Sequence, residues 1–179
     1  MRFGLCCASL TLALSALTGC SDTMKSPDVA SNVRHSLEQA NIQNVSVTQD
    51  RVKGVVTLNG HVPTDADKAR ADQLAQAAAQ GQVVANQIEV TPQGMESVAK
   101  NVDAKLDTAI GANLDAALLQ NGWSKAVHHS EKNGVVTLTG NVDSQQLRAD
   151  IERMSAAIPN VQQVVNTLEV KDQKASSTR

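Results

Sequence analysis

A repeated nine-residue stretch constrains the fold of this chain more than any other feature of its sequence. The segment GVVTLNGHV at residues 54–62 returns as GVVTLTGNV at residues 134–142. The two copies lie 134 − 54 = 80 positions apart, and the same offset pairs Asn86 with Asn166 without a gap. Two copies at so long a period are too few and too far apart for a solenoid. The sequence therefore predicts two small domains that share one fold.

Alternating apolar and polar side chains make each repeat a strand with one buried face and one wet face. Around it, periodic apolar positions predict the order helix, strand, strand, helix, strand in both copies. A turn dipeptide, Lys53-Gly54 or Asn133-Gly134, opens each repeat. Asn-Gly is the stronger hairpin signal because both residues tolerate positive φ. The expected fold class is α+β: two tandem αββαβ domains, each a small three-stranded mixed sheet packed by two helices.

The helix before the repeat differs in length between the copies. In the first copy, Ser26 and Pro27 predict a helix start, because Ser caps free N–H groups and Pro has a preset φ. In the second copy, apolar residues at a spacing of four continue over residues 97–120, about twice as far. Gly111 in the middle is a place where this helix can bend or split.

The chain opens with a segment typical of exported lipoproteins. The apolar run over residues 3–17 is too short for a comfortable membrane span and is typical of a secretory signal. It ends in the sequence LTGC, which resembles the lipobox of bacterial lipoproteins and implies that Cys20 carries the lipid. The alternative is an ordinary signal peptide with a chance Cys. In the lipobox interpretation, Ser21 implies that the protein is located on the periplasmic face of the outer membrane.

Cysteine usage and the polar end of the chain add to the predicted division of the chain into segments. Cys20 is the only cysteine left in the mature chain, so no internal disulfide is expected. The end of the chain is polar and is expected to be disordered. The predicted divisions are a signal peptide at 1–19, an N-terminal linker at 20–27, a first domain at 28–91, a turn-rich linker at 92–96, a second domain at 97–171 and a tail at 172–179.

Composition excludes several classes of partner. Removing the signal peptide removes Arg2, so the formal net charge becomes (16 − 1) − 18 = −3. Nucleic-acid binding, which needs an extended positive surface, is therefore not expected. Phe3 lies in the signal and Tyr is absent, which leaves Trp123 as the only aromatic residue of the mature protein. Base-stacking platforms and aromatic cages are excluded, and no cofactor is expected.

The repeated units resemble the BON domain, named for bacterial osmotically induced and nodulation proteins. Its pattern is an apolar helix, G-x-V-T-L-x-G-x-V, an amphipathic helix, and V-x-N-x-[IL]-x-V. The matching residues are Gly54, Val56, Thr57, Leu58, Gly60, Val62, Val84, Asn86, Ile88 and Val90, and again Gly134, Val136, Thr137, Leu138, Gly140, Val142, Val164, Asn166, Leu168 and Val170. Gly81-Gln82 departs from the Gly-Val usual in the family. Two copies behind a lipobox resemble dual-BON outer-membrane lipoproteins, which implies an envelope-integrity factor whose domains contact phospholipid headgroups.

The sequence offers no constellation for catalysis or for a metal ion. No Ser, Cys or carboxylate lies at a spacing that suggests a triad or an acid and base pair. Adjacent histidines in a strand point to opposite faces, so His128 and His129 do not chelate one metal ion, and a solvated or edge-strand role is favoured. The other histidines, His35 and His61, are scattered. We expect no catalytic residue, no metal site and no enzyme activity.

The unrepeated features say more about function. Trp123 follows Gly122 in the loop that leaves the long helix of the second copy. One interpretation is an anchor that caps the second core, and the other is insertion at a membrane interface, where an indole has one apolar and one wet side. In the second interpretation, Leu118, Leu119 and Trp123 form an apolar tip with Lys125 nearby for a phosphate.

The function that we expect is that of a lipid-anchored periplasmic protein. It binds phospholipid membrane through its acyl anchor and through the second domain, and it supports envelope integrity or stress tolerance. The alternative is a protein-interaction adaptor that docks on an outer-membrane assembly or the cell wall, with the acyl chains supplying all membrane affinity. Lipid binding by an unlipidated form of the protein separates the two.

Overall fold

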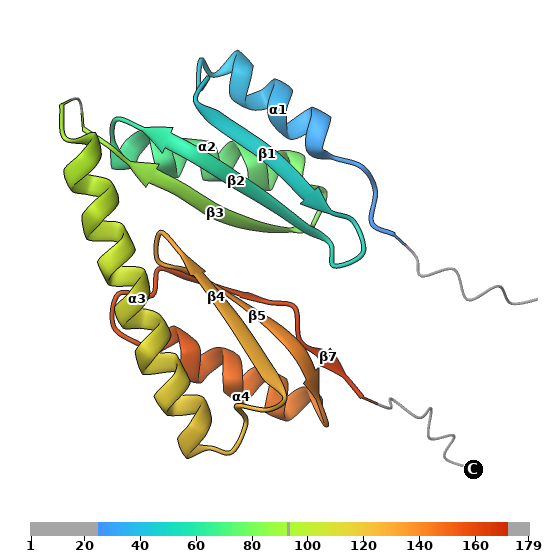
Figure 1. Cartoon of the computed structure of the whole chain (residues 1–179). Coiled ribbons are helices and arrows are strands. Elements are labelled where there is room, and N and C mark those ends of the chain that lie inside the picture. The colour runs from blue at the N-terminus through green and yellow to red at the C-terminus, as the bar shows by residue number, and fades with distance from the viewer. Residues whose placement is uncertain (1–24, 93, 172–179) are drawn as a thin grey trace, which may run out of the picture.

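The computed structural model describes residues 25–92 and 94–171, which form two αββαβ domains in succession (Figure 1). The predicted signal peptide, the lipid attachment residue Cys20 and the predicted tail lie outside the described residues. Within the described ranges, no helix combines the length and the apolar character needed to cross a membrane.

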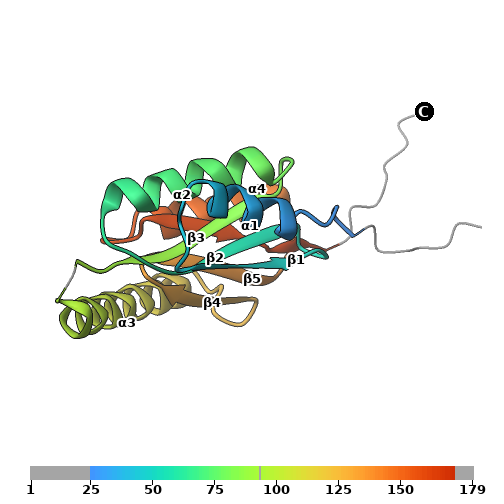
Figure 2. The same cartoon turned by 90° about the horizontal axis from the view of Figure 1, so that it is seen from above.

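The first domain is a three-stranded sheet with two helices on one face. Its middle strand is antiparallel to the first strand and parallel to the third. Figure 2 shows both helices on the same side of the sheet. The parallel pair needs a crossover, which the second helix supplies. The elements are α1 (Ala30–Gln39), β1 (Val45–Asp50), β2 (Val55–Val62), α2 (Asp65–Ala78) and β3 (Val83–Val90).

The second domain repeats this topology with one interruption. Its elements are α3 (Glu96–Gln120), β4 (Val127–Lys132), β5 (Val135–Val142), α4 (Gln145–Ala156), β6 (Gln163–Asn166) and β7 (Glu169–Val170). Both β6 and β7 pair in parallel with β5, in the position that β3 occupies in the first domain. The strand breaks where Thr167 turns its N–H and its hydroxyl to Leu138 O, at 3.0 and 2.7 Å. The predicted α+β class is confirmed, and the second sheet has four strands because its third strand is divided.

Each domain has its own apolar core between its helices and its sheet. On α2 the buried side chains are Ala71 and Ala75, whereas α4 buries Ile151 with Leu147 and Met154 packed against the same cluster. Burying a large aliphatic side chain contributes about 1.5–3 kcal/mol, and alanine contributes less. The helix behind the second sheet therefore contributes more apolar burial than its counterpart. The buried residues of the repeated strands are Val56, Leu58 and Val62 in β2 and Val136, Leu138 and Val142 in β5.

The first helix begins later than the sequence predicts and is capped from a distant strand. It starts at Ala30, and Ser26 caps no N–H group of the helix. Instead, Oε1 of Gln49 in β1 accepts hydrogen bonds from the N–H groups of Val29 and Ala30 at 3.1 and 3.3 Å. The Gln49 amide also donates to Pro27 O at 2.7 Å. The approach to α1 is therefore fixed by tertiary contact and not by a local cap.

The hairpin turns differ between the domains in the way that the dipeptides predict. Asn133 and Gly134 alone join β4 to β5, with φ values of 50° and 76°. Both values lie in the left-handed region that a two-residue hairpin turn requires. Residues 51–54 join β1 to β2 in a longer loop, in which Gly54 has a φ of 66°.

The long helix α3 is continuous over 25 residues. A split at Gly111, one of the two predicted alternatives, is therefore wrong. A side chain at Gly111 would meet the carboxylate of Glu131 in β4, since a Cβ there would lie 3.2 Å from its Oε2. A single glycine costs a helix only about 1 kcal/mol, and packing against β4 offsets that cost.

The two domains meet through a small apolar cluster between their sheets. Val55 and Ala85 of the first domain pack with Val135 and Val165 of the second. These positions are equivalent under the offset of 80, so the contact has approximate two-fold symmetry. Figure 1 shows β3 facing the sheet of the second domain. Two domains this small have limited cores of their own, and here each supports the other.

Candidate functional site

The helix α3 divides into a half that is buried in the second domain and a half that projects beyond it. Ile110, Leu114 and Leu118 are buried in the second core. Val98 and Val102 continue the spacing of four towards the N-terminus, yet they are 55% and 50% exposed. Four residues turn a helix by about 400°, so a stripe at this spacing drifts by about 40° per step and leaves the buried side. The apolar residues of the projecting half therefore face outward.

The outward side of α3 is largely apolar along its length. Leu119, at the C-terminal end, is 71% exposed. Lys105 is the one charged residue in this sector of the helix, judged by helical periodicity over its described residues. Apolar side chains predominate in this sector, and the amides of Asn101, Asn113 and Gln120 and the ammonium of Lys105 lie among them. A mostly apolar exposed face with a cation is typical of a surface that meets a partner or a lipid interface. We define the outer face of α3 by this sector, which contains Val98, Asn101, Val102, Lys105, Leu106, Ala109, Ala112, Asn113, Ala116, Leu119 and Gln120.

The predicted membrane-contacting tip is only partly exposed. Leu118 is 1% exposed and packs in the second core, so its place in the tip is corrected: it cannot touch lipid in this fold. Leu119 and Lys125 are exposed. The Trp123 side chain is half-buried against the second core, and the backbone N–H of Trp123 donates to Leu118 O at 2.8 Å. This arrangement favours the anchor interpretation of Trp123 while part of its side chain stays exposed.

The opposite side of the projecting half carries carboxylates and faces the rest of the fold. Asp107 accepts hydrogen bonds from the N–H groups of Asn133 and Gly134 at 2.8 and 2.9 Å, which fastens α3 to the β4–β5 turn. One turn earlier lies Asp103. Partial burial raises the pKa of Asp103, and the neighbouring carboxylates of Glu89 and Asp107 raise it further. The negative charge of α3 is thus directed inward here, away from its outer face.

A histidine with two carboxylate neighbours lies on β4. His129 Nδ1 is 2.5 Å from Glu131 Oε1, and its Nε2 is 3.0 Å from Asp115 Oδ1 on α3. His128 is exposed on the other face of the strand. In the part of the chain that the structure describes, no group of three His, Cys, Asp or Glu side chains is arranged to hold a metal ion. The contact between His129 and Asp115 could not be predicted from the sequence, because it joins two separate elements, β4 and α3.

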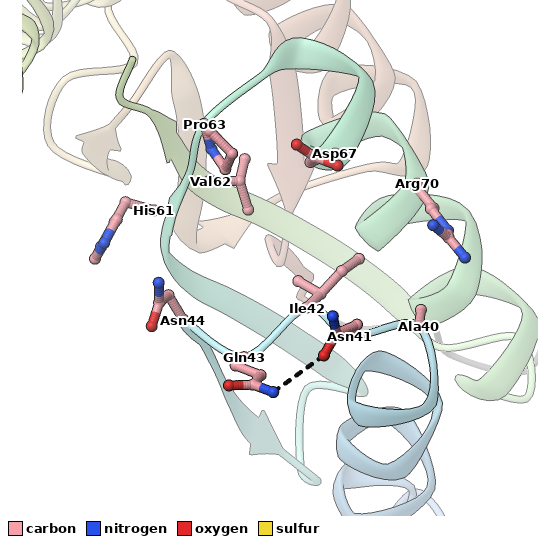
Figure 3. Close-up of a pocket in the computed structure, with 10 residues that line it drawn as sticks. All are labelled: Ala40, Asn41, Ile42, Gln43, Asn44, His61, Val62, Pro63, Asp67 and Arg70. Atoms are coloured by element: carbon pink, nitrogen blue, oxygen red, sulfur yellow. Dashed lines mark hydrogen bonds between the residues drawn. The ribbon is translucent and has the colours of Figure 1, made fainter. Parts of the chain in front are cut away.

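An open pocket of about 500 Å³ lies on the first domain (Figure 3). Its lining comes from the loop at residues 40–44, from the end of β2 and Pro63 after it, and from Asp67 and Arg70 of α2. His61 and Asp67 are titratable, but the lining residues include no Ser, Thr, Cys or Lys to serve as a nucleophile beside them. The pocket therefore has the chemistry of a polar surface hollow, with amide, imidazole, carboxylate and guanidinium side chains in its lining.

Comparisons with known proteins address the fold directly. Similar solved structures include two of CdsD, a structural protein of the type III secretion system of Chlamydia trachomatis. Each is 16% identical with a TM-score of 0.34; they cover 81% and 80% of this chain and 98% and 92% of the CdsD chains. A search of curated proteins finds no match. Residues 26–92 and 103–172 match the BON domain. Because these two matches take in nearly all of both αββαβ units and most of the sequence, the chain belongs to the BON domain family.

Proposed function

We propose that this protein binds phospholipid membranes through its second BON domain, while acyl chains on Cys20 hold it at the periplasmic face of the outer membrane. The observation that carries the proposal is the outer face of α3, a long, mostly apolar surface with one cation on a helix that is already fastened to the fold. The protein acts by binding, without catalysis, and supports envelope integrity or stress tolerance.

What is common to the family supports this assignment. BON domains are linked to phospholipid binding and to osmotic stress. Proteins that contain them are periplasmic or associated with the cell envelope, and the family is in general non-catalytic. The contact of α3 with lipid, the acyl anchor on Cys20 and the location at the outer membrane are what we propose for this protein in particular.

The energetics of the outer face suit reversible binding at an interface. Val98, Val102 and Leu119 would each bury apolar area in the boundary between headgroups and acyl chains, at about 25 cal/mol per Å². Lys105 beside them and Lys125 beyond the end of the helix add about 1 kcal/mol each near an anionic leaflet. These contributions are modest, so the acyl chains provide residence on the membrane and α3 provides orientation.

Vesicle co-sedimentation tests the proposal on protein produced without residues 1–20, which precede every helix and strand described. The vesicles contain phosphatidylglycerol and phosphatidylethanolamine. Leu119→Ser and Val102→Ser, both on the outer face, are expected to lower the bound fraction at least about threefold, because each removes apolar area from the interface. Trp123→Ala is less suitable, since Trp123 also packs against the core.

Val83→Ser is the matched control, because Val83 is 45% exposed and lies in the other domain. It should bind vesicles like the parent. If both α3 variants also bind like the parent, the outer face of α3 is not the contact. If no form binds vesicles and an envelope protein co-purifies instead, the protein is an adaptor whose membrane affinity comes from its acyl chains alone.

A further inference from the structure

The interface between the two BON domains is symmetric in its apolar centre but not in its polar contacts. Gln163 of the second domain donates to Val84 O at 2.6 Å and accepts from the N–H of Asn86 at 3.0 Å. One side chain thus satisfies two groups on the outer edge of β3. The equivalent position in the first domain is Val83, which has no group to donate or accept. The edge of β6 therefore receives no matching amide from the first domain.

The turns beside the interface show the same asymmetry. Asn133, in the β4–β5 turn, donates from Nδ2 to Gln87 O of the first domain at 2.7 Å. The equivalent position in the first domain is Lys53. Among the described residues, the Lys53 ammonium has no ion pair and no hydrogen bond. Gln163 and Asn133 of the second domain thus make polar contacts across one half of the interface. Within the described ranges, the equivalent residues of the first domain, Val83 and Lys53, make no such contacts across the other half.

A pocket of about 210 Å³ occupies the half of the interface without these contacts. Val52 and Lys53 line it from the first domain, and Arg148 with residues 166–169 line it from the second. The lining thus includes two basic residues and one acidic residue, Glu169. We call this site the Lys53–Arg148 pocket.

Within the described part of the chain, the Nε of Arg148 has no hydrogen-bond acceptor, whereas the ammonium of Lys68, at the equivalent position in the first domain, has one. The Nη2 of Arg148 donates to Asn166 O at 3.0 Å, but its buried Nε has no hydrogen-bond partner among the described residues. Lys68, the equivalent residue of the first domain, donates across the interface to Gln162 Oε1 at 3.1 Å. A buried N–H without an acceptor is unfavourable. An oxyanion that drew the guanidinium outward would supply the missing acceptor.

The chain enters the fold beside this pocket. Ser26 and Arg51 exchange two hydrogen bonds, from Ser26 N to Arg51 O at 2.7 Å and from Arg51 Nε to Ser26 O at 2.8 Å. Cys20 lies 26 − 20 = 6 residues earlier, a span of at most about 20 Å. Figure 1 shows the first described residues, the β1–β2 loop and β7 at the same end of the molecule. If Cys20 is acylated, Lys53 and Arg148 lie at the end held near the headgroups.

We infer that the Lys53–Arg148 pocket binds the phosphate group of a phospholipid headgroup in the anchoring leaflet. The planar guanidinium of Arg148 can donate two parallel hydrogen bonds to phosphate oxygens, and Lys53 adds a point charge. Glu169 repels a second negative charge, so the single charge of a phosphodiester suits the pocket better than the nearly double charge of free phosphate. The inference rests on the proposed acyl anchor, but it uses a surface separate from the outer face of α3.

Titration followed by backbone amide NMR tests the pocket on protein produced without residues 1–20. The probe is glycerophosphoglycerol, a headgroup without acyl chains. Saturable shifts are expected at Lys53 and at residues 166–169. Lys53→Gln should raise the Kd at least about fivefold, Arg148→Lys should also weaken binding, and Glu169→Gln should tighten it. Arg34→Gln, on the exposed side of α1, is the control for loss of one exposed cation and should leave the Kd unchanged.

Two further arms separate the possible ligands. Inorganic phosphate that binds as tightly as the headgroup would overturn the lipid source, and a tetraglutamate peptide that binds more tightly would overturn it in favour of a protein partner. Absence of saturable shifts at residues 166–169, or an unchanged Kd in Lys53→Gln, would overturn the site itself. Leu119→Ser should leave these shifts intact, so failure of the pocket and failure of the vesicle contact through α3 are seen in different experiments.

Discussion

Gly140 is a residue where the backbone leaves no room for any side chain. Its φ is 128°, and an added Cβ would lie 2.1 Å from Ala126 O. Strain and the clash act together, so Gly140→Ala is expected to lower the free energy of unfolding by about 2–4 kcal/mol. Urea unfolding followed by Trp123 fluorescence measures it. Gly122→Ala is the control, because Gly122 also has positive φ, at 73°, but nothing lies within 4 Å of its Cβ position. Equal losses in the two variants would show that the close approach contributes nothing.

Gln49 shows how a single side chain replaces a local helix cap. Removing its carboxamide leaves the N–H groups of Val29 and Ala30 without an acceptor, so Gln49→Ala is expected to cost about 1–2 kcal/mol of unfolding free energy. Ser26→Ala removes a residue that caps no helix and should cost under about 0.5 kcal/mol. Urea unfolding followed by far-UV circular dichroism compares them. A larger loss in Ser26→Ala than in Gln49→Ala would contradict the observed capping.

The elements of this fold could largely be predicted from the sequence, because their signals are local. Alternation over residues 54–62 and 134–142 predicts β2 and β5, and Asn133-Gly134 predicts the tighter hairpin. The start of α1 could not be predicted in this way, because its cap comes from Gln49 in another element. The same limit applies to His129 and Asp115, which tertiary structure alone brings together.

The candidate surface on α3 shows where periodicity is insufficient. The spacing of four predicts the length of the helix and its apolar character. It does not predict which apolar residues are buried, because α3 has apolar side chains on more than one side. Leu118 and Leu119 are adjacent and chemically identical, yet one is buried and the other is 71% exposed. Only contact with the sheet of the second domain decides between them.

The charged inner side of α3 leads to a prediction about pH. Partial burial, with Glu89 and Asp107 nearby, raises the pKa of Asp103 above its unfolded value, and attraction to Lys68 opposes this only in part. An acid with a raised pKa contributes most stability below its unfolded pKa and loses that contribution as pH rises through its folded pKa. Asp103→Asn should therefore raise Tm at pH 7 and have little effect at pH 3. Thermal unfolding at both pH values measures this, with the exposed Asp28→Asn as control. A Tm increase of equal size at both pH values would contradict it.

Across the interface, the second domain stabilises the first more than the first stabilises the second. The apolar cluster is shared equally, but the amide clamp of Gln163 and the turn contact of Asn133 both come from the second domain. The first domain also has the helix with alanines in its core contacts. The stability of the first domain should therefore depend on the interface more strongly than the stability of the second.

Gln163→Val tests this dependence by placing in β6 the residue type that β3 has at the same position. The change leaves Val84 O and the N–H of Asn86 without their partner, which should destabilise the first domain by about 1–3 kcal/mol. Trp123 fluorescence reports on the second domain alone, whereas far-UV circular dichroism reports on both. In urea, the dichroism transition of the variant should begin before the fluorescence transition, while the parent shows the two together. Gln162→Ala, which removes only an exposed contact to Lys68, should behave like the parent. If the two transitions of Gln163→Val still coincide, the apolar cluster alone is sufficient to couple the domains so that they unfold as one unit.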